Sequence, residues 1–168
     1  MANQYPVYFA GQRLTAALLS AGLPLMAKKT VDEGLNTNIT VQADDELFVP
    51  VVAGASYHAE AWVFYSAASN TPDIRINWTY PAGATFVRTD WGAPPASTST
   101  NDVVEMSTAT TADVGRAAGT TQRSIYMQGD LVVSSTAGNF RLVWAQVTSD
   151  AGTVSVKAGS FLKLTRYA

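Results

Sequence analysis

The chain has 168 residues, of which 47% are hydrophobic and 14% charged, and this composition suits one ordinary folded domain. A formal net charge of -2 leaves no basic field for a phosphate backbone, so we expect no nucleic-acid partner. The sequence has no cysteine, which excludes disulfides, thiolate metal sites and cysteine nucleophiles. No apolar run reaches the length of a membrane span, and the first residues lack the features of a signal peptide, so we expect a soluble protein without membrane insertion.

Residues 1–30 differ from the rest and are predicted to form an N-terminal arm and short helix, followed by a β-sandwich domain at 31–168. The helix is predicted between Thr15, which can cap it, and Gly22, which can end it. About two turns of helix are not stable alone in water, so its leucines should be buried against the sheet or against a partner. Both alternatives stay open. The candidate docking residues are Tyr5, Tyr8, Phe9, Leu14, Leu18 and Leu19.

The remaining residues alternate in character with period two, which is typical of antiparallel strands. The longest such run, Tyr57 to Tyr65, carries aromatic side chains on both faces, as an interior strand does. Pro50 places the run before it at a sheet edge or bulge. We predict about eight to ten strands in an all-β, jelly-roll-like antiparallel β-sandwich. The other expected strands are 74–79, 84–88, 103–106, 123–133, 139–146, 153–156 and 160–167.

Residues that could support catalysis or bind metal are few. His58, the only histidine, lies within a predicted strand, and no Gly-x-Ser-x-Gly elbow accompanies it, so we interpret it as a partly buried structural residue. The run Asp44–Glu46 lacks the spaced acidic residues and internal glycine of a calcium loop, and we interpret it as a solvated turn that guards a strand. We therefore expect no catalytic residue, no metal and no cofactor, and no enzymatic activity.

A second kind of site is suggested by three residues near a loop. Tyr80, Asp90 and Trp91 could form a sugar-binding platform, because aromatic faces with nearby carboxylates hold pyranose rings. The polar loop at 92–100, rich in proline, serine and threonine, could complete it. The alternative is that these aromatic side chains simply pack locally.

Three segments carry a resemblance to a known family. The stretch Phe9–Leu19, the strand entry Asp44–Val51 and the ending from Leu142 to Arg166 are similar to small virion proteins of tailed bacteriophages, especially those that infect actinobacteria. The resemblance covers nearly the whole chain in patches, and its motifs have no catalytic content. It implies a jelly-roll sandwich like the trimeric heads of the tumour-necrosis-factor superfamily. The absence of a collagen-like or coiled-coil stalk argues against a long-fibre role.

These observations predict a non-enzymatic structural protein of a bacteriophage virion, made in the host cytoplasm. Capsid decoration and a minor tail position are both compatible with the sequence. The expected partners are two further copies in a homotrimer and other virion proteins, either the major capsid protein or tail proteins. The alternative function is a module of the phage tail that binds a host-surface glycan or receptor.

Overall fold

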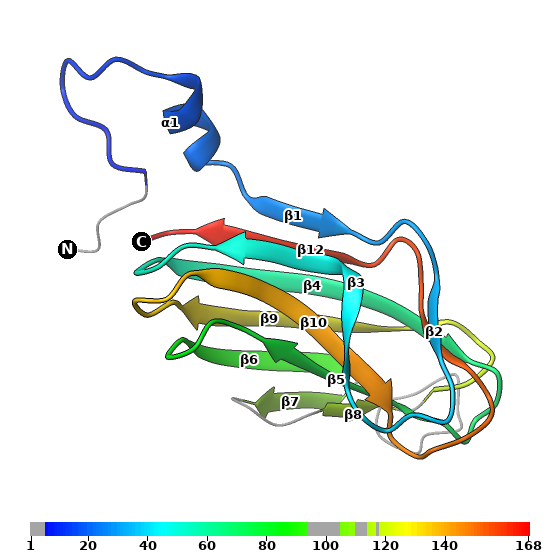
Figure 1. Ribbon diagram of the computed structural model, residues 1–168. Coiled ribbons are helices and arrows are strands. Elements are labelled where there is room, and N and C mark those ends of the chain that lie inside the picture. The colour runs from blue at the N-terminus through cyan, green and yellow to red at the C-terminus, as the bar shows by residue number, and fades with distance from the viewer. Residues whose placement is uncertain (1–5, 94–104, 110–113, 117) are drawn as a thin grey trace.

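The computed structural model describes residues 6–93, 105–109, 114–116 and 118–168, and within them the chain forms two packed antiparallel sheets and one short helix (Figure 1). The helix is α1 (Ala16–Ala21). The strands are β1 (Leu25–Lys28), β2 (Glu33–Leu35), β3 (Gln42–Val51), β4 (Ser56–Ala67), β5 (Ile74–Thr79), β6 (Thr85–Gly92), β7 (Glu105–Ala109), β8 (Val114–Arg116), β9 (Arg123–Val132), β10 (Gly138–Gln146), β11 (Val154–Val156) and β12 (Phe161–Arg166).

The strand order is that of a jelly roll with additions. The larger sheet runs β1-β12-β4-β9-β6-β7, with β11 beside β4 and β2 beside β11, and the smaller sheet runs β3-β10-β5-β8. From β3 to β10 the chain crosses between the sheets: β3, β5, β8 and β10 form the smaller sheet, and β4, β6, β7 and β9 lie side by side in the larger one, which is the strand order of a double-sheet jelly roll. The additional strands β1 and β12 extend the larger sheet beyond β4, and β11 and β2 are attached beside β4. The jelly-roll-like antiparallel sandwich expected from the sequence is confirmed.

The core lies between the two sheets and follows from the alternation of each strand. In β4, every second side chain from Tyr57 to Tyr65 is buried, and the intervening ones face outward. Opposite them, β10 contributes Phe140 and Trp144, both fully buried. The rings of Trp78 and Phe140 stack with centroids 4.9 Å apart, and Phe86 meets Phe140 edge to face at 4.9 Å. These rings join the sheets in the middle of the sandwich.

Most strand predictions are confirmed, and the exceptions have local causes. The interior position of β4 between β12 and β9, and the edge position of β3 with Pro50, agree with the sequence pattern. The strand predicted at 103–106 overlaps β7 at Glu105 and Met106, and its first two residues, 103 and 104, lie outside the described part of the chain. The short strands β2 and β8 were missed, because three residues carry too little alternation to be recognised, whereas β11 lies within the strand predicted at 153–156.

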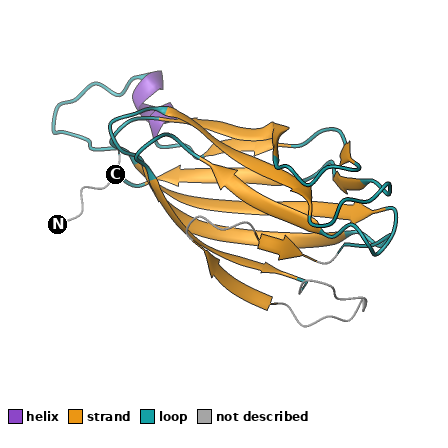
Figure 2. Ribbon diagram, turned by 60° about the horizontal axis from the view of Figure 1, so that its bottom comes forward, coloured by secondary structure: helices purple, strands orange, loops and turns teal. Residues whose placement is uncertain are grey.

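The boundary of the sandwich also differs from the sequence estimate. Strand β1, assigned to the N-terminal segment by its position, pairs with β12 from Leu25 to Lys28 and is part of the larger sheet. The sequence missed it because these four residues, which end at the first lysine of the Lys28–Lys29 pair, show no clear period. Of the described residues, those that precede Leu25, 6–24, extend past one end of the sandwich (Figures 1 and 2). Among the described residues, no helix is both long enough and apolar enough to span a membrane.

Candidate functional site

The N-terminal segment, defined here as residues 6–24, has a local fold of its own. A tight turn brings the amide of Gln12 to the carbonyl of Phe9 at 3.0 Å, and Gly11 adopts the positive φ of 76° that this turn requires. The helix α1 follows, and the side chain of Thr15 accepts a hydrogen bond from the amide of Leu18 at 3.2 Å. The predicted cap is confirmed. The segment therefore has regular local structure, a tight turn followed by a capped helix.

This segment exposes its apolar side chains. Phe9 is 71% exposed, Leu14 59% and Leu19 54%, and no residue of α1 is buried. Tyr8 is also exposed, Leu18 is half-buried, and Tyr5 lies outside the described residues. Of the two alternatives for these leucines, burial against the chain's own sheet does not hold for Leu14 and Leu19, and burial against a partner stays a prediction. Their hydrophobic surface is left available for contact with another molecule.

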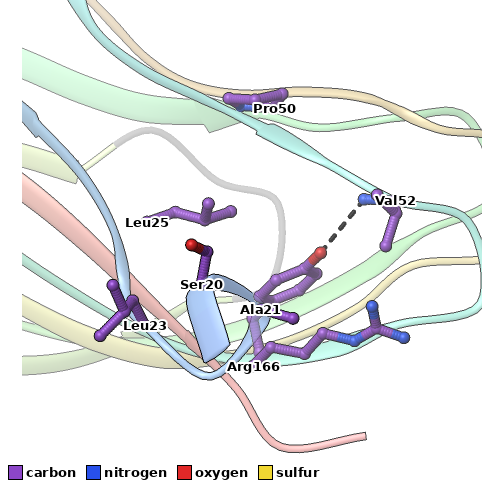
Figure 3. Close-up of a pocket in the computed structure, with 8 residues that line it drawn as sticks. Ser20, Ala21, Leu23, Leu25, Pro50, Val52 and Arg166 are labelled. Atoms are coloured by element: carbon purple, nitrogen blue, oxygen red, sulfur yellow. Dashed lines mark hydrogen bonds between the residues drawn. The ribbon is translucent and has the colours of Figure 1, made fainter. Parts of the chain in front are cut away.

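A cavity of about 240 Å³ lies between the base of the N-terminal segment and the end of the sandwich (Figure 3). Its lining is mostly apolar, and the amide of Val52 donates a hydrogen bond to the hydroxyl of Tyr57 at 3.1 Å beside it. The guanidinium-bearing side chain of Arg166 also lines it. The helix therefore rests over a space that its own side chains do not fill. The lining residues are Ser20, Ala21, Leu23, Leu25, Pro50, Val52, Tyr57 and Arg166.

A second surface lies on the outer face of the larger sheet, where aromatic side chains cross four neighbouring strands. Trp91 of β6 is in register with Tyr126 of β9, which is in register with Trp62 of β4, and Trp62 with Phe161 of β12. We call these four residues the aromatic row. The ring centroids of Trp91 and Tyr126 are 5.4 Å apart, and those of Trp62 and Tyr126 5.6 Å. Trp62 is 42% exposed and also stacks on Phe64.

A polar row lies beside the aromatic row, two residues along each strand, at a distance of about 7 Å. The ammonium group of Lys163 contacts the carboxylate of Glu60 at 2.6 Å. This hydrogen bond lowers the pKa of Glu60, which keeps the carboxylate ionised. Burial, and then the charge of Glu60, raise the pKa of Tyr126, so its phenol stays protonated. The polar row consists of Thr89, Gln128, Glu60 and Lys163.

The three residues predicted as a sugar platform do not share one surface. Asp90 is fully buried between the sheets, where its carboxylate contacts the guanidinium of Arg88 at 2.9 Å. Burial raises the pKa of Asp90 against the opposing effect of Arg88. Tyr80 is half-buried and packs edge to face on Phe86. Only Trp91 lies on the outer face, and residues 94–100 of the neighbouring loop are outside the described residues.

The acidic run at the start of β3 is not the solvated turn predicted from the sequence. Asp44 is fully buried and contacts the ammonium group of Lys29, itself 1% exposed, at 2.9 Å. Glu33 contacts the same ammonium at 2.7 Å. Burial lowers the pKa of Lys29, but the hydrogen bonds to Glu33 and Asp44 outweigh it and raise the pKa overall. This cluster joins the start of the sandwich to β3 and has a structural role.

His58 was expected to be partly buried, but it is exposed on the outer face of β4. The prediction was wrong because the core is built from the opposite face of β4, which carries Tyr57 and Ala59 on either side of His58 in the sequence. Within the described ranges, no group of three or more His, Asp or Glu side chains is placed to hold a metal ion.

The aromatic row was not recognised as a unit from the sequence. Its four members come from strands that are up to 99 positions distant, Trp62 to Phe161, and only the strand register brings them together. A partial signal was present in β4, where Trp62 and Phe64 occupy the same face as His58 and Glu60. Large aromatic side chains on the polar face of an interior strand indicate a surface with a second purpose.

Comparisons with known proteins give little further information. No protein-family model matches the sequence, and no curated protein matches it. Among solved structures, the chain is similar to one described as the structure of infectious bursal disease virus, Gx strain, with 9% sequence identity and a TM-score of 0.26. The alignment covers 86% of this chain and 39% of the viral chain. A similarity at this level carries no argument about function.

Proposed function

We propose that the chain is a non-enzymatic structural protein of a bacteriophage virion, either a capsid decoration protein or a minor tail component. The similarity of three sequence segments to small virion proteins supports this. The jelly roll is compatible with it, because this architecture occurs in viral capsid domains, although it occurs in lectins too. The observation that carries the proposal is the N-terminal segment, which presents exposed Phe9, Leu14 and Leu19 beyond the end of the sandwich.

In this proposal the N-terminal segment docks on another virion protein, the major capsid protein or a tail protein. Burying a large apolar side chain contributes roughly 1.5–3 kcal/mol, so a few such residues can anchor a small domain. A side chain from the partner could enter the cavity beneath α1 and fix the helix against the sandwich. The turn and the capped helix hold the segment in shape, which reduces the entropy lost on docking.

The copies are proposed to associate as a homotrimer. The N-terminal segment and the C-terminus lie at the same end of the sandwich (Figure 1). Three parallel copies around a threefold axis would therefore present three segments to one anchoring surface, and the linked contacts would strengthen binding by multivalency. Light scattering of the purified protein at micromolar concentration tests this part. A stable monomer would remove the trimer from the proposal.

The docking proposal is tested with phage particles assembled without this chain. Purified protein should co-sediment with them, and the double variant Phe9→Ser, Leu19→Ser should lose binding with an unchanged melting temperature. The matched control is Val87→Ser, Val132→Ser, which alters two exposed apolar residues of the sandwich, 51% and 43% exposed, and should bind as the wild type does. Equal binding by the N-terminal variant, or absence of the chain from purified native particles, would contradict the proposal.

A further inference from the structure

We propose that the outer face of the larger sheet is a binding site for a neutral saccharide chain, which lies along the aromatic row. This goes beyond the structural role proposed above and uses a different surface from the N-terminal segment. The face is built on four paired strands, so its side chains are held more firmly than loop residues would be.

The chemistry of the two rows matches a sugar ring. A pyranose has a face of C–H groups, which packs on aromatic rings, and an edge of hydroxyl groups, which needs donors and acceptors. The aromatic row supplies the rings, and the polar row lies about 7 Å away, within reach of the hydroxyls. Glu60 is an ionised acceptor, Lys163 a donor, and the exposed amide of Gln128 is both.

The shape of the apolar surface favours a linear ligand. Four adjacent strands give the aromatic row a length of about 14 Å, comparable with a short oligosaccharide. Its width is limited. The polar row adjoins it on one side, and on the other side Phe64 adds one ring, beyond which Ser124 and Ser66 are polar. A stable protein interface buries roughly 800 Å² on each partner around an apolar centre. A second copy seated here would have to bury the Glu60–Lys163 ion pair at a desolvation cost.

The charge of the face identifies a neutral saccharide rather than an anionic one. Strands β1, β12, β4, β9 and β6 place two cations and two anions on it, Lys28 and Lys163 against Glu60 and Asp130. The cations therefore provide no excess positive potential that would attract a polyanionic glycan. His58 is the remaining titratable group on this face of β4.

The four tryptophans provide a test on the unmodified protein. Trp78 and Trp144 are buried in the core, whereas Trp62 and Trp91 lie on the outer face. Iodide should quench only the outer pair. Hexasaccharides of glucose, N-acetylglucosamine, mannose and galactose, each added to millimolar concentration, are the neutral probes, and a hyaluronan hexasaccharide is the anionic one. At least one neutral probe should protect the fluorescence from iodide, and the anionic probe should not.

Calorimetric titration of the variants then assigns the site. Trp62→Ala should weaken binding of the active hexasaccharide by about tenfold or more. The matched control is Tyr167→Ala, which removes an aromatic side chain equally exposed at 42% but outside the row, and it should change binding less than twofold. Gln128 is exposed, so Gln128→Ala should leave the fold intact and weaken binding by a smaller factor.

Three results would overturn the proposal. The first is no protection by any neutral probe. The second is binding that Trp62→Ala and Gln128→Ala leave unchanged. The third is an oligomer that Trp62→Ala converts to a monomer while no saccharide binds, which would make the face a contact between copies. None of these results bears on whether the N-terminal segment docks on a virion, so the two proposals fail separately.

Discussion

The two faces of the larger sheet are made of alternate residues of the same strands, yet they are organised differently. On the inner face, Tyr57, Val63 and Leu162 are at most 2% exposed and meet the smaller sheet. On the outer face, Trp62 is 42% exposed and rests on other outer aromatic side chains. The inner face accounts for stability by burial. The outer aromatic rings add little to it, so a separate reason for their presence is required.

The largest effect is expected on the inner face. Phe86 is 2% exposed and contacts both Phe140 and Tyr80. Phe86→Ala should lower the free energy of unfolding by about 3–5 kcal/mol, because it removes buried surface and leaves a cavity. Urea denaturation followed by tryptophan fluorescence measures it. A loss below about 1 kcal/mol would mean that the core can close around the gap and that the contrast between the faces is smaller than described.

Ion pairs sharpen the same comparison. Lys29→Met leaves the buried carboxylate of Asp44 without its cation and should cost about 3 kcal/mol. The matched change on the outer face is Lys163→Met, which breaks a half-exposed pair with Glu60 and should cost less than about 1 kcal/mol. Denaturation of both variants under the same conditions gives the difference. Similar losses of unfolding free energy in the two variants would contradict the distinction between the buried and the half-exposed ion pair.

The raised pKa of Lys29 predicts a dependence on alkaline pH. A raised folded pKa contributes stability that is fully present below the ordinary value of 10.5 and is lost as pH rises through the folded value. The difference in unfolding free energy between the wild type and Lys29→Met should therefore shrink above about pH 10.5. Urea titrations at intervals from about pH 8 to about pH 12 measure this difference, because this range brackets the ordinary lysine pKa. A difference that grows with pH would reverse the assigned sign.

Truncation of the aromatic row should have a smaller effect on stability. Trp62→Ala removes ring contacts with Phe64 and Tyr126 at a position open to water. We expect a loss of about 1 kcal/mol, the magnitude of aromatic pair interactions. The measurement is the same denaturation used for Phe86→Ala. A loss equal to that of Phe86→Ala would assign the row to the stability of the fold instead of binding.

The smallest effect is expected in the N-terminal segment. Thr15→Ala removes the hydrogen bond to the amide of Leu18 and should destabilise α1 by about 1 kcal/mol. Because no residue of the helix is buried, the melting temperature of the sandwich should not change. Amide hydrogen exchange should show faster exchange in α1 alone. A lower melting temperature would mean that the helix is part of the core.

The sequence predicted those features that depend on neighbouring residues. The alternation of β4, β9 and β12 defined the inner face, and Thr15 with Gly22 marked the ends of the helix. These patterns arise from the side-chain period of a strand and the unpaired amides of a helix, both of which are local. The jelly-roll architecture followed from the number and spacing of such strands.

The features that were missed depend on pairing across the chain. The burial of Asp44 required knowing that Lys29 lies opposite it. Arg88 and Asp90 are neighbours on one face of β6, and their burial required knowing that this face packs against the smaller sheet. The aromatic row required the registers of four strands. A charged residue in a strand is normally expected at the surface, and only tertiary contacts can overturn that expectation.

The most direct test of the proposed function is electron cryomicroscopy of intact particles of the phage proposed to contain this chain. We predict density for the sandwich on the capsid or the tail, with residues 6–24 against another virion protein and the aromatic row facing solvent. Capsid-wide density would identify a decoration protein, and density limited to the tail a minor tail component. Absence of the sandwich from the particle, or an N-terminal segment that faces solvent while the sandwich alone makes the contact, would contradict it.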